Sequence, residues 1–280
     1  GDGQKLSLRV QTNGDYYHAV SLSFTEPWLG GRKPNALSVG VYYSYQDDGF
    51  WNTTGTSEYY IGILGGSVSL ATRLKWPDDY FTLVHGLAYQ QYNVKNYTTL
   101  TAMPTGISNN INYNFTLARN SVDQLIYPRQ GSDISLAAQM TFPYSLVNGK
   151  DYSSLSPAER YKWLEYYKIN FRAAWYFNLF DDLVVSTRAR FGFLGQYNSK
   201  VGYSPFERFY LGGDGLTGYQ LDGRELVALR GYDESSLSPD GGGMVFDKYT
   251  MELRYPITLN EGASVYALAF FEAGNSWANF

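Results

Sequence analysis

Short segments in which apolar and polar residues alternate one by one constrain the fold of this chain more than any other feature. Over residues 35–46, for example, Leu37, Val39 and Val41 fall on one side of an extended chain, and Ser38 falls on the other. A period of two residues is the signature of a β-strand with two different faces. Equally regular alternation occurs over 4–11, 110–120, 132–142, 166–179, 183–193 and 248–255. The pattern therefore predicts an all-β fold.

Other segments alternate less regularly and are also predicted to be strands, namely 16–26, 57–73, 80–94 and 263–277. Gly65 and Gly66 predict a bulge or a change of phase within their strand, because glycine weakens a strand interior. Together the segments give about eleven strands, many of about ten residues, the length that a tilted strand needs to cross a bilayer. One short turn of helix is predicted within the loop region 154–167.

A soluble β-sandwich has the same alternation, with one face in a core and one in water. Two features favour a membrane barrel instead. Aromatic residues make up 18% of the chain, which suits the aromatic girdles at the two membrane interfaces. The connections also alternate between short ones (75–79, 178–182 and 258–262) and long ones (47–57, 93–109, 143–161 and 198–243). Bacterial barrels place short turns in the periplasm and long loops outside. The sequence thus predicts a transmembrane antiparallel up-and-down β-barrel in the cell outer membrane.

Several other classes of protein are excluded or disfavoured by composition. No apolar run reaches the length of a membrane helix, and residues 1–20 contain no apolar signal region, so we expect a mature chain or a fragment. The chain has no cysteine, which excludes disulfides and thiolate metal sites. Its net charge of -4 gives no reason to expect nucleic acid as a partner.

Catalysis is not expected either. The two histidines, His18 and His85, lie in predicted strands, and no nucleophile elbow or H-x-x-x-H pair accompanies them. The glycine-rich pieces 211–215 and 240–243 lack the lysine of a phosphate loop and are interpreted as turns. We therefore predict no catalytic, cofactor-binding or metal-binding residue.

Four segments, in this order, carry a family resemblance: SLSFTEPWLGGRKPNALSVG (21–40), YPRQGSDISL (127–136), ERFYLGGDGLTGYQLDGRELVALRGYDE (207–234) and FFEAGNSW (270–277). They resemble the barrel domain of the BamA family of outer-membrane assembly factors, within the wider POTRA-transporter superfamily. The third segment contains a [VIL]-R-G-[FY] motif of the family's sixth loop, formed here by Leu229, Arg230, Gly231 and Tyr232. The fourth resembles a family strand motif through Phe270, Glu272 and Gly274.

The position of Arg230 is the main structural question that these motifs raise. A guanidinium inside a barrel needs a carboxylate partner, and alternation along the last strand turns Glu272 away from the lipid-facing set that includes Phe271. The residues alone also allow an exposed arginine without a partner. The resemblance implies an Arg230–Glu272 contact, although the family acid is usually aspartate. We expect Phe270 and Tyr232 to pack beside the pair. Gly231 is expected to adopt a conformation that a Cβ would hinder.

The resemblance also implies an incomplete domain. Family barrels have about sixteen strands and follow soluble POTRA domains. Residues 1–280 are expected to form a partial outer-membrane barrel, beginning near the third family strand and ending just past the thirteenth. The loop that contains Arg230 is longer here than the family form, which leaves its path open. The basic residues Arg188 and Arg190 are expected only to solvate the barrel interior.

The function implied by the resemblance is the folding and insertion of nascent outer-membrane proteins through a lateral gate, without an enzyme activity or a cofactor. A substrate strand would add to an exposed strand edge. The implied partners are nascent outer-membrane proteins, accessory outer-membrane lipoproteins and the lipid bilayer. Three alternatives remain: a related secretion or translocation barrel (TamA-like or of the two-partner type), a passive channel, and an outer-membrane enzyme.

Overall fold

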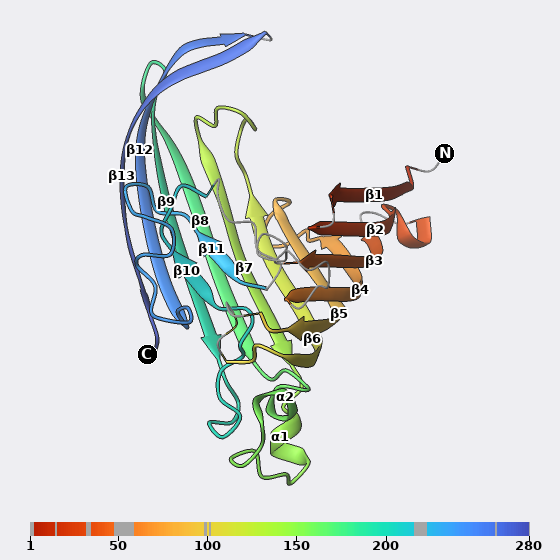
Figure 1. Cartoon of the computed structure of the whole chain (residues 1–280). Coiled ribbons are helices and arrows are strands. Elements are labelled where there is room, and N and C mark those ends of the chain that lie inside the picture. Colours follow the sequence, from red (N-terminus) through yellow and green to blue (C-terminus); the bar gives the residue numbers. More distant parts are fainter. Residues whose placement is uncertain are drawn as a thin grey trace.

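The computed structural model describes residues 3–14, 16–31, 35–47, 59–97, 100, 102–215, 223–260 and 262–279. Eleven strands form one sheet in which each strand pairs with the next in chain order (Figure 1). These are β1 (Lys5–Asn13), β2 (Tyr17–Glu26), β3 (Asn35–Asp47), β4 (Tyr60–Arg73), β5 (Phe81–Lys95), β6 (Gly106–Asn120), β7 (Gly131–Thr141), β8 (Tyr167–Phe180), β9 (Leu183–Gly195), β12 (Val245–Asn260) and β13 (Ala263–Trp277). All the pairs are antiparallel, which confirms the predicted up-and-down all-β fold.

The remaining elements lie in the connections. Strands β10 (Phe209–Leu211) and β11 (Glu225–Val227) pair in parallel within the connection from β9 to β12. Helices α1 (Tyr144–Val147) and α2 (Pro157–Arg160) lie between β7 and β8, and the 3-10 turn η1 (Leu29–Gly31) follows β2. Helix α2 matches the predicted helical turn. Ser156 precedes its first residue as the N-cap, and the Ser156 hydroxyl donates a 2.7 Å hydrogen bond to the Glu159 carboxylate.

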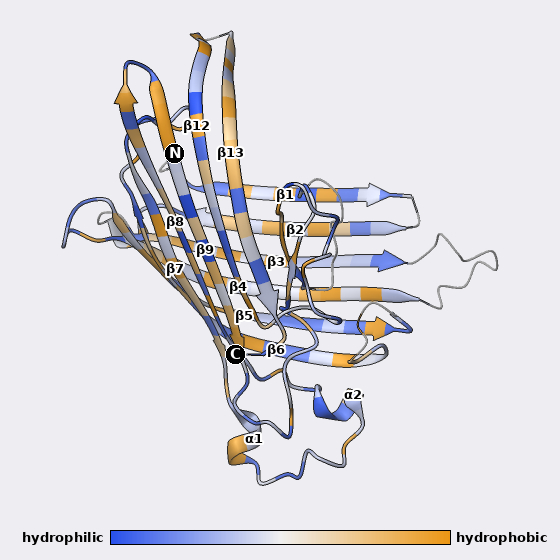
Figure 2. Cartoon of the chain, turned by 90° about the vertical axis from the view of Figure 1, so that its left-hand side faces the viewer, coloured by the Kyte–Doolittle hydropathy of each residue, from blue (hydrophilic) through white to orange (hydrophobic). Residues whose placement is uncertain are grey.

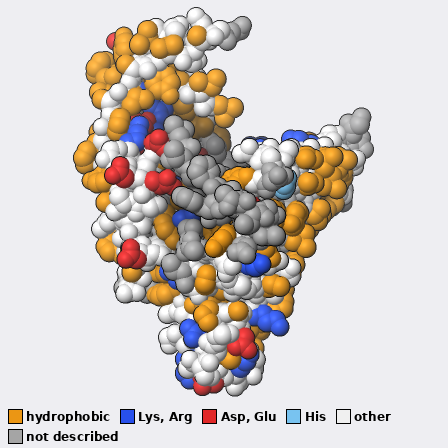
Figure 3. Space-filling model, viewed as in Figure 1, with side chains coloured by type: hydrophobic (Ala, Val, Ile, Leu, Met, Phe, Trp, Pro, Cys, Tyr) orange, Lys and Arg blue, Asp and Glu red, His pale blue; other side chains and the backbone are white. Residues whose placement is uncertain are grey.

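In this sheet the apolar face is exposed and the polar face is partly covered, which is the reverse of a soluble sheet. Along β12, the apolar Met251 is 53% exposed, whereas the neighbouring Glu252 is 4% exposed. Figure 2 shows the resulting alternation of hydrophobic and hydrophilic bands along the strands. In the space-filling view, hydrophobic side chains line the outer flanks and charged side chains are seen within the hollow (Figure 3). An exposed apolar face suits lipid and is unsuited to water, which distinguishes the barrel wall from a sandwich.

Within the part of the chain that the structure describes, no helix is both long and apolar enough to span a membrane.

The predicted bulge at Gly65 and Gly66 is wrong. The pairing of β4 with β3 and with β5 continues through both glycines without a change of register. Gly65 has a different role, because a Cβ at this position would collide with the ring of Tyr42 on β3. The glycine therefore makes room for a neighbouring aromatic ring in an unbroken strand.

The apolar core lies on the concave side of the sheet, between the wall and the long connection 196–244 (Figure 1). Fully buried side chains come from the wall, such as Tyr92 and Phe246, and from the connection, such as Phe206 and Leu229. The rings of Tyr92 and Phe206 stack with centroids 4.1 Å apart. This core holds the connection against the inner surface of the sheet, where it meets the charged face of β12 and β13.

Candidate functional site

The described parts of the connection between β9 and β12, residues 196–215 and 223–244, fold back onto the concave side of the sheet (Figure 1). Two points far apart along this connection are joined, because the backbone nitrogen of Phe209 donates a 3.0 Å hydrogen bond to the carbonyl of Gly243. Further along, the backbone nitrogen of Leu229 donates to the carbonyl of Gly213, and that of Gly213 donates to the carbonyl of Tyr232. The segment 229–232 is thus fixed from both sides by one glycine of the same loop.

Leu229 is the apolar anchor of this segment. It is 1% exposed and belongs to the buried cluster that includes Leu211 and Val227 of the paired strands β10 and β11. Phe209 packs on Phe246 of β12, with ring centroids 4.7 Å apart. Burial of these side chains stabilises the loop on the wall, since each large apolar side chain removed from water contributes about 1.5–3 kcal/mol.

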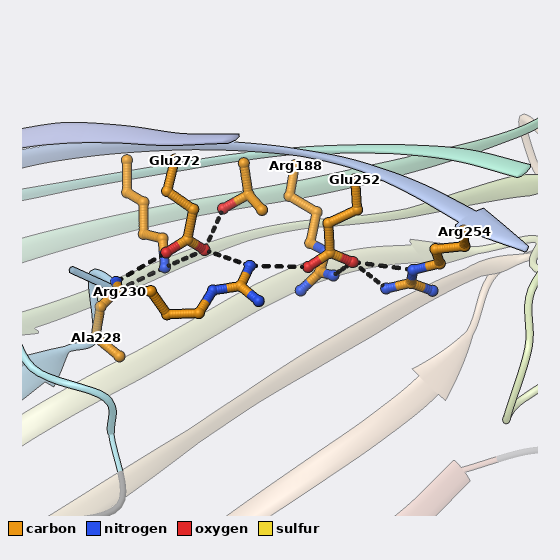
Figure 4. Close-up of polar contacts among 8 residues, drawn as sticks. Arg188, Ala228, Arg230, Glu252, Arg254 and Glu272 are labelled. Atoms are coloured by element: carbon orange, nitrogen blue, oxygen red, sulfur yellow. Dashed lines mark hydrogen bonds and ion pairs between the residues drawn. The ribbon is translucent and has the colours of Figure 1, made fainter. Parts of the chain in front are cut away.

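Arg230 follows directly and reaches the wall at Glu272 on β13 (Figure 4). Its Nη2 donates to the Oε1 of Glu272 at 3.0 Å, and its backbone nitrogen donates to the Oε2 of the same carboxylate at 2.9 Å. The structure therefore brings together the arginine and the acid that the sequence motifs single out. The Glu272 side chain is 5% exposed and that of Arg230 is 35% exposed, so the carboxylate is shielded from water while the guanidinium stays partly hydrated.

A second carboxylate, Glu252 on β12, completes the contact. The Nη2 of Arg230 also donates to its Oε1 at 3.0 Å. Glu252 lies opposite Phe270, and Thr250 lies opposite Glu272, so the two acids occupy neighbouring inward positions on adjacent strands. We call Arg230, Glu252 and Glu272 the arginine clamp. The guanidinium bridges β12 and β13, the two strands of one hairpin, on the concave face of the sheet (Figure 4).

Both carboxylates have further cationic partners on the wall. Arg188 of β9 contacts the Oε2 of Glu252, and the Nη2 of Arg254 donates to the same oxygen at 2.6 Å. Lys248 contacts the Oε1 of Glu272 at 3.0 Å and donates to the loop carbonyl of Ala228 at 2.6 Å. The prediction that Arg188 only solvates the interior is therefore wrong, because its guanidinium is an ion-pair partner of a buried acid.

The other motif residues have distinct places. The ring of Phe270 lies under the Arg230 guanidinium, 3.6 Å from the ring centroid to Cζ, which is a cation–π contact. Gly231 has a φ of +90°, a conformation that a side chain disfavours. Gly274 allows β12 and β13 to approach closely, because a Cβ there would lie 2.5 Å from the carbonyl oxygen of Asp247. Tyr232 is half exposed, and its carbonyl is bonded to Gly213.

A second set of ion pairs fixes the loop at its other side with the charges reversed. Here the loop supplies the acids, Glu207 and Glu225, and the wall supplies the bases. Lys168 of β8 lies 3.0 Å from Glu207 and 3.1 Å from Glu225, and Arg190 of β9 lies 3.3 Å from Glu225. The prediction that Arg190 only solvates the interior is therefore also wrong.

One loop arginine is held by backbone carbonyls. Arg208 donates to the carbonyl oxygens of Ser204 at 2.9 Å and of Gly241 at 3.0 Å, which closes the base of the loop. Burial lowers the pKa of Arg208 below its ordinary value. Its contacts fix backbone positions, whereas those of Arg230 connect the loop to the wall.

Comparison with known protein families identifies the chain. A family model described as the Omp85 superfamily domain matches residues 1–279. The chain belongs to the Omp85 superfamily. No curated protein matches it. Among solved structures, it is similar to the crystal structure of BamA from Haemophilus ducreyi lacking POTRA domains 1-3, with a TM-score of 0.70 and 19% identity. That match covers 99% of this chain and 52% of the BamA chain, so this chain spans about half the length of the solved one.

In this Omp85 chain, sequence reasoning identified the loop arginine and one of its acids but missed the other. Glu252 stands on the polar face of a predicted strand, and pairing that strand with 263–277 through the short link would have placed it near Glu272. The basic partners Lys168 and Arg190 gave no comparable signal, because the acids they meet, Glu207 and Glu225, lie in the long connection and stand in no strand that the sequence predicted.

The histidines of this Omp85 chain lie in the wall. His18 lies 3.2 Å from the hydroxyl of Thr12, and His85 lies beside the ring of Tyr113. Among the residues that the structure describes, no group of three or more histidine, cysteine, aspartate or glutamate side chains could hold a metal ion.

Proposed function

We propose that this Omp85 chain forms part of the wall of an outer-membrane barrel that folds and inserts nascent β-barrel proteins. The observation that carries the proposal is the arginine clamp, in which Arg230 joins the inserted loop to Glu252 and Glu272. The proposed activity needs neither catalysis nor a cofactor, because the work is done by backbone hydrogen bonds and by burial of apolar surface.

The clamp argues against a passive solute channel as the function. A loop that is bonded to the inner surface by two sets of ion pairs occupies space that an open pore would need. It also braces β12 and β13 from inside, and a braced wall is useful where another part of the barrel must open. We propose that the clamp keeps this part of the wall closed while the lateral gate of the complete barrel opens elsewhere.

In the proposed mechanism, a nascent strand pairs with an exposed strand edge at the gate and thereby gains the hydrogen bonds that lipid cannot supply. Successive strands then follow, and local thinning of the bilayer lowers the barrier to insertion. Nascent outer-membrane proteins, accessory outer-membrane lipoproteins and the bilayer are the proposed partners.

The test is reconstitution of the natural full-length protein in lipid vesicles with an unfolded outer-membrane barrel as client. Folded client is measured over time by its electrophoretic mobility without heating. We expect the client to fold faster in these vesicles than in vesicles that contain an unrelated barrel. The Arg230→Ala variant should fold the client more slowly than the unchanged protein. Asp133→Asn, which removes only a 3.7 Å contact with Arg172, serves as the matched control.

Two outcomes would contradict the proposal. Protection of a secreted soluble passenger inside the vesicles, without acceleration of client folding, would indicate a translocation barrel instead. Rapid release of a small trapped solute, again without client folding, would indicate a channel.

A further inference from the structure

A group of exposed and partly exposed apolar side chains lies in the connection that follows β7. It consists of Phe142, Tyr144, Leu146, Val147 and Trp163, and we call it the apolar ledge. Leu146 is 61% exposed and Val147 is 66% exposed, although both are aliphatic. Figure 2 shows α1, which carries these two residues, as a hydrophobic end of an otherwise mostly hydrophilic connection. A contiguous apolar surface of this kind marks a contact site.

The ledge continues the lipid-facing side of the sheet. Met140 of β7 lies opposite Tyr113 of β6, and both side chains are exposed on the outer face. Phe142 follows Met140 by two residues and is also exposed, so it lies on the same face. Its ring contacts that of Tyr144, with centroids 5.2 Å apart, and Tyr144 contacts Trp163 at 5.5 Å.

Hydrogen bonds to the polar side of α1 fix the orientation of the ledge. The buried carboxylate of Glu165 accepts hydrogen bonds from the backbone nitrogen of Ser145 at 2.5 Å and from its hydroxyl at 2.6 Å. The hydroxyl of Ser145 also accepts a 3.1 Å bond from Asn198. Because the polar side of α1 is bonded to the protein, its apolar residues Leu146 and Val147 are left to face outward.

The polarity of the chain changes abruptly after α1. Asn148 ends the helix, and the exposed Lys150 and Asp151 follow within four residues of Val147. Leu146 stands only five residues past the end of β7, a distance of about 10 Å along strand and helix, which is comparable to the depth of a headgroup layer. Aromatic residues and short apolar segments at the level of the lipid headgroups are typical of membrane interfaces.

We propose that the apolar ledge is a membrane anchor that inserts Leu146, Val147 and Trp163 into the interfacial layer of the leaflet on the long-loop side. The occupant is lipid, because the ledge is continuous with the lipid-facing wall and ends where the chain becomes charged. The anchor fixes the height of the 142–166 connection relative to the bilayer surface.

Residues 1–280 contain no cysteine, so single-cysteine variants in this region allow a direct test, made in the natural full-length protein with any cysteine outside the region replaced by serine. Leu146→Cys carries an environment-sensitive fluorophore in phosphatidylcholine vesicles. The quenchers are a nitroxide attached to the lipid near its headgroup and iodide in the water. Met140→Cys on the outer wall is the membrane control, and Ser153→Cys in the same connection is the water control.

We expect the Leu146 label to be quenched by the lipid nitroxide and to be several-fold less accessible to iodide than the Ser153 label. A Leu146 label as accessible to iodide as Ser153, with Met140 quenched by lipid, would overturn the anchor. Shielding from iodide in whole cells but not in vesicles would also overturn it, and would indicate a protein partner. If the Met140 label were itself accessible to iodide, the outer wall would not face lipid there, and the anchor would be overturned together with the wall from which it is inferred.

Discussion

Strands β1 and β12 have the same alternating pattern but very different surroundings. Along β1, side chains on both faces are mostly exposed, including the inward Arg9. Along β12, the outward side chains are exposed, whereas Phe246, Thr250 and Glu252 are buried. In the described sheet, β1 is an edge strand that pairs with β2, whereas β12 lies between β9 and β13 and its inner surface is covered by the described parts of the loop 196–244. Alternation therefore defines which side chains share a face, while burial of that face depends on what is packed against it.

The same comparison shows where an unpaired charge would destabilise the fold. A carboxylate on the inner face of β12 is covered by the loop and needs cationic partners, because desolvation of an unpaired charge costs several kcal/mol. A charged residue on the inner face of β1 remains hydrated. Substitutions at the two strands should therefore differ strongly in their effect on stability.

The largest effect is expected for Glu252→Gln. The change removes the carboxylate shared by Arg188, Arg230 and Arg254 and leaves three guanidinium groups close together. Breaking a buried ion pair in this way should lower the free energy of unfolding by about 3–5 kcal/mol. Urea unfolding in detergent micelles, followed by tryptophan fluorescence, measures this. An unchanged midpoint would mean that the loop does not desolvate β12.

Gly274→Ala is expected to have the next largest effect. Its Cβ would lie 2.5 Å from the carbonyl oxygen of Asp247, so β12 and β13 must separate locally. Overpacking of this kind should cost about 1–3 kcal/mol. Thermal unfolding followed by electrophoretic mobility measures the loss. Gly40→Ala in β3 is the control, because a Cβ there would lie 3.7 Å from its nearest neighbour, an ordinary contact.

Arg230→Lys tests the geometry of the clamp while keeping its charge. An ammonium lacks the planar fork with which the guanidinium reaches Glu252 and Glu272 and stacks on Phe270. We expect a loss of about 1–2 kcal/mol. Limited proteolysis of the loop should become faster. Cleavage at the wild-type rate would indicate that a point charge is sufficient.

The smallest effect is expected for Arg9→Gln on β1. Because this side chain is exposed, the free energy of unfolding should change by less than about 0.5 kcal/mol. The measurement is the same urea titration as for Glu252→Gln. A loss as large as that of the β12 variant would show that the inner face of β1 is covered in the full-length protein, and the contrast between the two strands would disappear.

The strands of the sheet could be predicted from the sequence because each carries a period of two over many residues. Strands β10 and β11 could not, since Phe209–Leu211 and Glu225–Val227 are only three residues long and their parallel pairing depends on distant contacts. Helix α1 was missed for a similar reason, as its four residues are held by Glu165 from the far side of the connection. The wrong bulge at Gly65 arose because the ring of Tyr42 that needs the space belongs to another strand.

The candidate site was predictable only in part, and the missing part is informative. Arg230 and Glu272 each stand in a short motif, so a family resemblance could pair them. Glu252 stands in no such motif and emerges only from the register of β12 with β13. An arginine that contacts two acids is therefore harder to predict than a single ion pair, because the positions of three backbone segments must be known at once.

Both carboxylates of the arginine clamp come from β12 and β13, which follow the loop in the chain. The clamp can therefore form only when the loop and this hairpin are both in place. The hairpin, in turn, carries two acids whose cationic partners are spread over β9, β12 and the loop. A chain that ended before β13 would lack Glu272 and would leave Glu252 as the one remaining carboxylate of the clamp, while the ion pairs of Glu207 and Glu225 with β8 and β9 would still hold the other side of the loop.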